Sequence, residues 1–200
     1  MTPGQVTLLI VDDHGDWRAG MVSSLASRAP GVNVGYAGPS VDEAIRARLE
    51  HPGACLALVD AHSPDGSVST PAVRALRERG VAVAAISAHV EPEAILELIT
   101  AGALACVLKS DLRDCLDDLI ALAPAQHLYL TPAVAASLLT TPAALALPQA
   151  QRQALQWQAA GVPLPVALQT NGLGENEYAT AIAGLVEVLQ RANHGTETSS

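Results

Sequence analysis

Five polar residues stand where short apolar runs of the sequence end: Asp12, Asp13, Asp60, Ser87 and Lys109. Clustered carboxylates raise one another's pKa, and a hard divalent cation such as Mg²⁺ relieves that repulsion. With Mg²⁺ bound, one carboxylate can attack a phosphoryl group and form an aspartyl phosphate. An ammonium and a hydroxyl can then stabilise the transferring oxygens. These residue types therefore predict a phosphoryl-accepting site, provided that the fold brings them together.

Lys109 is the only lysine of the chain, which has 11 lysines and arginines in all. A compact ammonium can enter a tight site where the planar fork of arginine fits poorly. Plainer interpretations exist for single residues, since Asp13 could cap a helix and Lys109 could be an ordinary surface residue. The agreement of all five positions favours the site.

Five apolar runs must position these residues, and short helical stretches separate them. The runs cover 6–11, 33–37, 55–60, 81–87 and 104–109. The helical stretches cover 16–28, 40–50, 69–80, 91–102 and 110–122. Strict alternation of this kind predicts an α/β fold with a doubly wound, five-stranded parallel sheet of the flavodoxin-like type. Such sheets bind ligands beyond the carboxyl ends of their strands, where the five polar residues stand.

Local signals mark several helix ends. Ser40 with Glu43 forms a capping-box pattern, and Thr70 is the expected N-cap of the next helix, with Pro71 as its first residue. Gly80 and Gly102 follow the expected ends of two helices. No glycine-rich nucleotide-binding motif is present, so no dinucleotide or nucleotide cradle competes for the site.

Composition indicates which partners and which compartment to expect. The formal net charge of −9 argues against a general affinity for nucleic acid or anionic membranes. The three cysteines, Cys55, Cys106 and Cys115, form no CxxC pair and are expected as buried free thiols in a reducing cytoplasm. Because no signal peptide opens the chain and no apolar run approaches the ~20 residues of a membrane helix, we expect a soluble cytoplasmic protein.

Four segments, "LLIVDDH", "ALVDAHSPDG", "AISAH" and "CVLKSD", resemble the receiver domain of two-component response regulators, and the resemblance covers residues 6–122. It implies that Asp60 accepts the phosphoryl group and that Ser87 and Lys109 bind it. It also implies an Mg²⁺ site, with ligands from Asp12, Asp13, Asp60 and the backbone carbonyl of His62. A histidine kinase or a small phosphodonor would supply the phosphoryl group, and a homodimer is expected. No enzymatic activity is expected beyond the receiver's own phosphorylation and dephosphorylation.

Two features depart from the family pattern. The loop that follows Asp60, "SPDGSVS", is shorter than usual. Cys106 stands at the switch position, three residues before Lys109, where the family has Tyr or Phe. Histidines at 14, 62 and 89 flank the same rim, so a transition-metal site is an alternative, although their spacing matches no zinc pattern.

The second half of the chain resembles LuxR/NarL-type response regulators in the length and order of its helices. We expect a receiver over 1–122, a linker with one short helix over 123–147, a degenerate helix-turn-helix domain over 148–193 and a disordered tail over 194–200. The linker helix should open at Thr131 and Pro132, and the first helix of the domain should end at Gly161.

Ordinary DNA binding is not expected from this second half. Residues 148–200 contain two arginines, Arg152 and Arg191, against four glutamates. The outward positions of the last helix offer no Arg, Lys, Asn or Gln to read bases. We therefore expect an atypical regulator that acts through protein–protein contact. The alternatives are a dimeric, sequence-specific DNA-binding regulator and an interaction module that works without phosphorylation.

Overall fold

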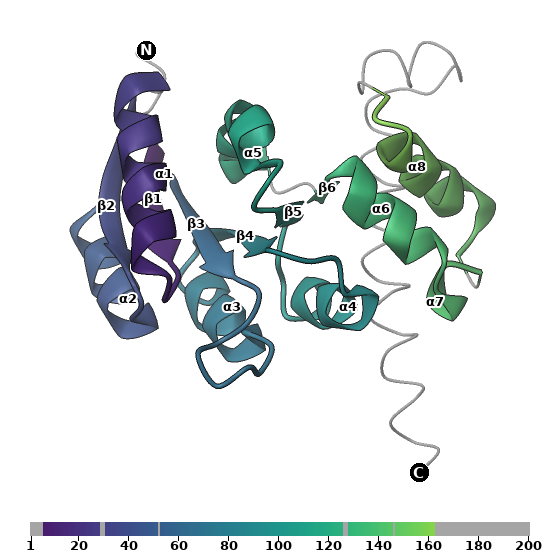
Figure 1. Ribbon diagram of the computed structural model, residues 1–200, viewed down its shortest axis with the longest axis horizontal. Coiled ribbons are helices and arrows are strands. Elements are labelled where there is room, and N and C mark those ends of the chain that lie inside the picture. Colours follow the sequence, from purple (N-terminus) through teal and green to yellow (C-terminus); the bar gives the residue numbers. More distant parts are fainter. Residues whose placement is uncertain (1–5, 29–30, 52, 126–127, 146, 163–200) are drawn as a thin grey trace.

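Parallel strands and helices alternate in the computed structural model, which describes residues 6–28, 31–51, 53–125, 128–145 and 147–162 (Figure 1). The first five strands are β1 Val6–Val11, β2 Val32–Gly38, β3 Cys55–Asp60, β4 Ala82–Ser87 and β5 Ala105–Leu108. The helices between and after them are α1 Gly15–Arg28, α2 Val41–Glu50, α3 Thr70–Arg77, α4 Pro92–Thr100 and α5 Leu112–Ala125. The five predicted strands and five predicted helices are confirmed, with ends that differ by a few residues.

A single parallel sheet holds the strands in the order β2-β1-β3-β4-β5-β6. The order reverses between β1 and β3, and a doubly wound sheet opens its ligand-binding crevice at such a reversal. The predicted flavodoxin-like sheet is therefore confirmed. It has one strand more than predicted, because β6 (Tyr129–Leu130) pairs with β5.

Both faces of the sheet are buried, because successive side chains of a strand point to opposite sides. In β1, Leu9 belongs to one apolar cluster and Leu8 to the other. The first cluster lies under α2, α3 and α4, and the second lies under α1 and α5. Figure 1 shows these helices on opposite sides of the sheet.

Most predicted helix ends are confirmed. The Ser40 hydroxyl accepts a hydrogen bond from the Glu43 backbone N–H at 3.3 Å. Gly80 and Gly102, which follow α3 and α4, have φ values of 71° and 107°, a region that glycine enters without steric cost. The prediction of Thr70 as an N-cap was wrong by one residue. Thr70 is already helical and Ser69 is the N-cap, so the proline lies at the second helical position.

The chain after α5 packs beside the sheet rather than leaving it. α6 (Pro132–Leu139) begins after Thr131 as predicted, and α7 (Pro142–Leu145) and α8 (Gln149–Ala159) follow. Leu138 of α6 and Leu155 of α8 are fully buried in the same cluster as residues of β1, α3 and α4. The predicted stop at Gly161 is confirmed by a φ of 64°. The part of the predicted helix-turn-helix domain that follows residue 162, and the predicted tail, lie outside the described residues.

The three cysteines are free and buried, as predicted. Burial raises the pKa of the Cys106 thiol to about 12 and that of the Cys115 thiol to about 11, so both remain protonated and unreactive at neutral pH. In the part of the chain that the structure describes, no helix has the length and apolar character to cross a membrane.

Candidate functional site

The carboxyl ends of three strands bring the site together. Asp60 is the last residue of β3, Asp12 follows β1 and Lys109 follows β5. Backbone hydrogen bonds fix the last two. Asp12 N–H donates to Gly38 O at 3.1 Å, and Lys109 N–H donates to Ser87 O at 2.7 Å. The polar residues therefore meet at one edge of the sheet because the strands are parallel and in register.

Lys109 lies between two carboxylates. Its Nζ is 2.7 Å from Asp60 Oδ2 and 2.7 Å from Asp12 Oδ2. Burial lowers the pKa of Lys109, but its hydrogen bonds and attraction to the two aspartates outweigh burial and leave the pKa above its ordinary value. Lys109 is therefore a permanently charged group at neutral pH. One small ammonium contacts both oxygens, a geometry that suits lysine better than the wider, planar arginine.

Asp13 and His14 complete the cluster on the solvent side. The Nδ1 atom of His14 lies 2.8 Å from Asp13 Oδ1, 3.2 Å from Asp12 Oδ1 and 3.6 Å from Asp60 Oδ2. The backbone N–H of His14 also donates to Asp12 Oδ1 at 2.7 Å. One ligand atom from each of these four residues lies within 4.8 Å of the others. They form a compact set of three carboxylates and one imidazole.

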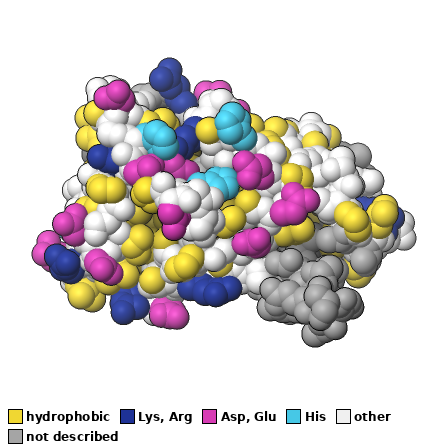
Figure 2. Space-filling model, turned by 60° about the horizontal axis from the view of Figure 1, so that its bottom comes forward, with side chains coloured by type: hydrophobic (Ala, Val, Ile, Leu, Met, Phe, Trp, Pro, Cys, Tyr) yellow, Lys and Arg dark blue, Asp and Glu magenta, His cyan; other side chains and the backbone are white. Residues whose placement is uncertain are grey.

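A cavity of about 50 Å³ adjoins this cluster, and its walls include all three aspartates together with His62. The backbone N–H of His62 lies 3.4 Å from Asp60 Oδ1. Its imidazole turns the other way, with Nε2 3.3 Å from Glu91 Oε2. His62 thus links the loop after β3 to the start of α4 at the rim of the site. Figure 2 shows histidine and acidic side chains gathered together on this side of the molecule.

Ser87 stands close to the cluster but is engaged elsewhere. It ends β4, and its hydroxyl accepts a hydrogen bond from the backbone N–H of His89 at 3.2 Å. No hydrogen bond joins the Ser87 hydroxyl to Asp60 within the described residues. The strand register places Ser87 one residue beyond Ile86, the partner of Asp60. A hydroxyl can accept and donate at the same time, so Ser87 can donate to a phosphoryl group while it keeps the hydrogen bond from His89.

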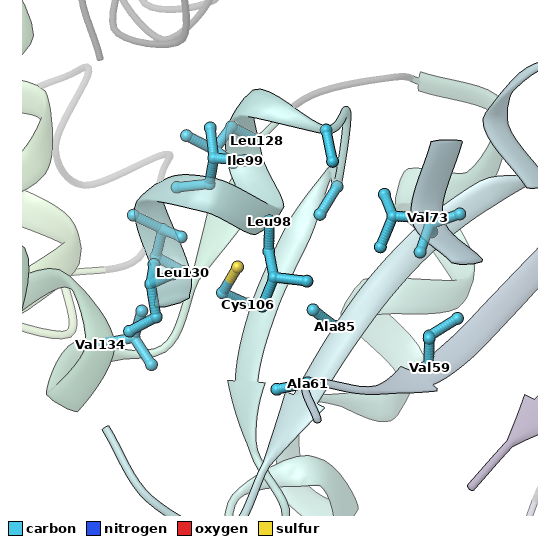
Figure 3. Packing of buried hydrophobic residues seen from close by; sticks show 14 of the residues in the cluster. Val59, Ala61, Val73, Ala85, Leu98, Ile99, Cys106, Leu128, Leu130 and Val134 are labelled. Atoms are coloured by element: carbon cyan, nitrogen blue, oxygen red, sulfur yellow. The ribbon is translucent and has the colours of Figure 1, made fainter. Parts of the chain in front are cut away.

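Cys106 lies inside the core rather than at the rim. Its side chain is buried among Leu98 of α4, Leu130 of β6 and Val134 of α6 (Figure 3). A cavity of only about 10 Å³ joins this position to Ser87. The switch position is thus covered by the chain's own β6 and α6.

The short loop after Asp60 forms a compact turn. Ser63 N–H donates to Ser67 O and Gly66 N–H donates to Ser63 O, both at 2.8 Å. Asp65 accepts from the Ser67 N–H at 3.0 Å and from its hydroxyl at 2.7 Å. These bonds lower the pKa of the exposed Asp65 carboxyl and hold it away from the site. Ser63 and Pro64 of this turn line the cavity beside Asp60, together with His62.

Sequence reasoning missed three neighbours of the site. The ring of Trp17 lies 5.0 Å from Lys109 Nζ, a cation–π contact. Arg18 donates a hydrogen bond to the backbone carbonyl of Asp12. Glu91 pairs with His62. Trp17 and Arg18 lie in the first turn of α1, which begins directly after the acidic pair and His14, so the start of α1 was the signal that could have identified them.

The donor set suits a hard cation. Three carboxylates at one point offer the oxygen ligands that Mg²⁺ prefers, and the adjoining cavity has room for the water molecules that Mg²⁺ retains. The charged Lys109 beside Asp60 suits a negatively charged group at the same place.

No protein-family model matches the chain, and no curated protein matches it by sequence. Solved structures do match. A LuxR-family two-component response regulator from Aurantimonas sp. SI85-9A1 is 25% identical, covers 66% of this chain and 94% of its own, and gives a TM-score of 0.57. The receiver domain of the response regulator NarL from Mycobacterium tuberculosis is 27% identical over 61% of this chain and 98% of its own, with a TM-score of 0.52.

A third match extends further along the chain. The match with the response regulator RcsB from Salmonella typhimurium covers 92% of both chains, with a TM-score of 0.57. Only 14% of the residues are identical, so this match supports the fold alone. RcsB has also been solved in complex with DNA, a property of that protein. In its receiver fold, the chain is similar to two-component response regulators of the LuxR/NarL family.

Proposed function

We propose that the chain is a phosphoryl-accepting response regulator, with Asp60 as the acceptor. The observation that carries this proposal is the position of Lys109 Nζ, 2.7 Å from both Asp60 and Asp12. An ammonium between two carboxylates at the end of a parallel sheet is poised to transfer its ion pair to a new anionic group on Asp60.

The reaction requires little from the protein beyond position and charge. An Asp60 carboxylate oxygen attacks the phosphorus of the donor, and the bond from phosphorus to the donor's leaving group breaks. Lys109 keeps its proton and pairs with a phosphoryl oxygen in place of the carboxylate. Ser87 donates its hydroxyl hydrogen to another oxygen, while its oxygen can still accept from the His89 N–H. The donor would be a histidine kinase or a small phosphodonor.

Mg²⁺ is the cofactor that this site would hold, through Asp12, Asp13, Asp60 and the backbone carbonyl of His62. When bound, it supplies positive charge to the transferring oxygens. The carboxylate of Asp12 is fully buried. Because Asp12 directly follows β1, the strand fixes the position from which this carboxylate would hold the ion. The partly exposed Asp13 faces the solvent side, from which an ion enters.

Intact-mass measurement after incubation with a small phosphodonor tests the acceptor. We expect one base-labile phosphoryl group per chain when Mg²⁺ is present, and none with EDTA. Asp60→Asn should abolish the gain, whereas Asp65→Asn should retain it, because Asp65 is exposed and hydrogen-bonded within its own turn. Modification of the Asp60→Asn protein to the same extent would refute the assignment. No other enzymatic activity is proposed.

The output proposed is a protein–protein contact in transcriptional regulation, without ordinary DNA reading. Arg152 is one of two basic residues after residue 147, and it donates to Leu145 O at 2.9 Å and Leu147 O at 3.0 Å. An arginine that caps two backbone carbonyls is a poor anchor for DNA phosphates. A homodimer and a protein target in the cytoplasm remain the partners that we propose.

DNA binding is tested directly with the phosphorylated, full-length protein. Fluorescence anisotropy with labelled duplexes at low salt should give no saturable binding, because net charge opposes it. Binding that is sequence-selective and weakens steeply with salt would instead support a dimeric DNA-binding regulator.

A phosphorylation-independent interaction module is the second candidate. It is favoured by the burial of Cys106 under α6, since the usual aromatic switch has no counterpart there. If this is correct, wild type and Asp60→Ala should have the same oligomeric state and partner affinity with and without phosphodonor. A change in oligomeric state on phosphorylation, measured by light scattering, would exclude it.

A further inference from the structure

The imidazole of His14 lies at a place that the proposed phosphoryl chemistry does not use. Its Nδ1 faces three carboxylates from two strand ends, at 2.8, 3.2 and 3.6 Å. The other rim histidines lie elsewhere, since His62 pairs with Glu91 and the exposed His89 lies outside the cluster. One histidine of three is therefore built into the acidic cluster.

These spacings match ligand atoms that share one metal ion. Ligands at about 2.1 Å from an ion lie about 3.0 to 3.4 Å apart in octahedral or tetrahedral geometry. The distances from His14 Nδ1 to the three carboxylates fall around this range, and the whole set of four ligand atoms lies within 4.8 Å.

The local backbone fixes the position of the His14 main chain beside the carboxylates. The His14 N–H donates to Asp12 Oδ1, and α1 begins at the next residue, so the imidazole starts from a fixed turn. The carboxylate of Asp12 is fully buried, and its Oδ2 lies 2.7 Å from the Lys109 ammonium. Asp12 is thus oriented by two groups, with Oδ1 toward His14 and Oδ2 toward Lys109.

We propose that His14 is a nitrogen ligand of this site, which therefore prefers first-row transition ions over Mg²⁺. Neutral imidazole suits Zn²⁺ and its neighbours in the series, whereas Mg²⁺ favours oxygen ligands and keeps its waters. Asp12, Asp13 and Asp60 supply the oxygen ligands and His14 the nitrogen. The inference deepens the proposed function, on whose metal-dependent site it rests.

Calorimetric titration of the full chain with Zn²⁺ and with Mg²⁺ at one fixed pH tests the proposal. We expect wild type to bind Zn²⁺ more tightly than Mg²⁺, and His14→Ala to lose about tenfold or more in Zn²⁺ affinity while its Mg²⁺ affinity changes less than about threefold. His89→Ala is the matched control, since it removes an exposed histidine from the same rim and should leave both affinities unchanged. In a long-range ¹H–¹⁵N spectrum, Zn²⁺ should shift Nδ1 of His14 and leave that of His89 in place.

Two results would overturn the proposal: equal loss of Zn²⁺ and Mg²⁺ affinity in His14→Ala, or no loss of either. Its failure can be told from that of the proposed function. If Mg²⁺ still supports phosphorylation of Asp60 while Zn²⁺ affinity does not depend on His14, only the ligand assignment fails. If Zn²⁺ binds through His14 but Asp60 accepts no phosphoryl group, only the proposed function fails.

Discussion

At the scale of single residues, Lys109 is the group on which the geometry of the site depends. Its ammonium is shared by a carboxylate that is fully buried, that of Asp12, and one that is nearly so, that of Asp60. Two adjacent carboxylates without this cation would repel each other in a poorly solvated place. The only lysine of the chain is therefore explained by a charge that must be compact and close to two oxygens at once.

Replacement of Lys109 by Met, which retains the packing of the stem, should reduce the free energy of unfolding by about 2–4 kcal/mol in EDTA, because a buried carboxylate loses its partner. Urea unfolding measures this loss, and added Mg²⁺ should recover part of it. Arg113→Met removes an exposed positive charge from α5 and should change stability by less than about 0.5 kcal/mol. Equal stability of Lys109→Met and wild type in EDTA would contradict the ion-pair interpretation.

The pH dependence of the same comparison follows from the raised pKa of Lys109. A raised pKa in the folded protein means that the ammonium stabilises the fold at pH values below the unfolded pKa of about 10.4. The stability difference between wild type and Lys109→Met should therefore be constant from neutral pH to about pH 9 and shrink as pH rises through the raised pKa. A difference that shrinks already near neutral pH would point to another group.

Cys106 gives a second prediction at this scale. Because it is only 3% exposed and the adjoining cavity is about 10 Å³, the aromatic ring that the family places there has no room. Cys106→Tyr should lower the free energy of unfolding by about 1–3 kcal/mol through overpacking. Cys106→Val, which is similar in volume, should cost about 1 kcal/mol or less. Thermal unfolding compares the two variants. A tyrosine variant as stable as wild type would show that α6 can shift to accommodate the ring at little cost in stability.

At the scale of elements, β6 and α6 cover the edge and one face of β5, the last predicted strand of the receiver. β6 pairs with the free edge of β5, and α6 packs over β5 and α4. The α4–β5 side is therefore covered by the chain itself in this arrangement. Under the proposed function, a partner could bind this side only if phosphorylation moved α6 away from it.

Truncation of a buried side chain on α6 tests how much this packing contributes. Leu138→Ala should lower the free energy of unfolding by about 2–5 kcal/mol, because Leu138 is fully buried in the main cluster. Leu145→Ala on α7 is the control, since Leu145 is 73% exposed and its truncation should change stability by less than about 0.5 kcal/mol. Chemical denaturation gives both values, and a neutral Leu138→Ala would mean that α6 is not held against the sheet in solution.

At the scale of the whole molecule, one apolar cluster runs from β1 to α8, so the described chain should unfold as a unit. The two tryptophans stand near opposite ends of the described chain, Trp17 in α1 and Trp157 in α8. Variants that keep one tryptophan each, Trp157→Phe and Trp17→Phe, should show fluorescence transitions with the same cooperativity. Once each variant's own stability is measured by circular dichroism, its fluorescence midpoint should coincide with that value. An earlier transition of Trp157 than of the backbone would reveal that α8 detaches first.

The sequence by itself determined the sheet and the candidate site residues. Apolar runs, caps and glycines are local signals, and parallel strands bring their ends together, so Asp12, Asp60 and Lys109 could be placed at one edge before any coordinates. Only the tertiary structure decided that His14 turns into the carboxylates and that Cys106 lies beneath α6. These depend on side-chain rotamers and on packing between segments far apart in the chain, which periodicity does not encode.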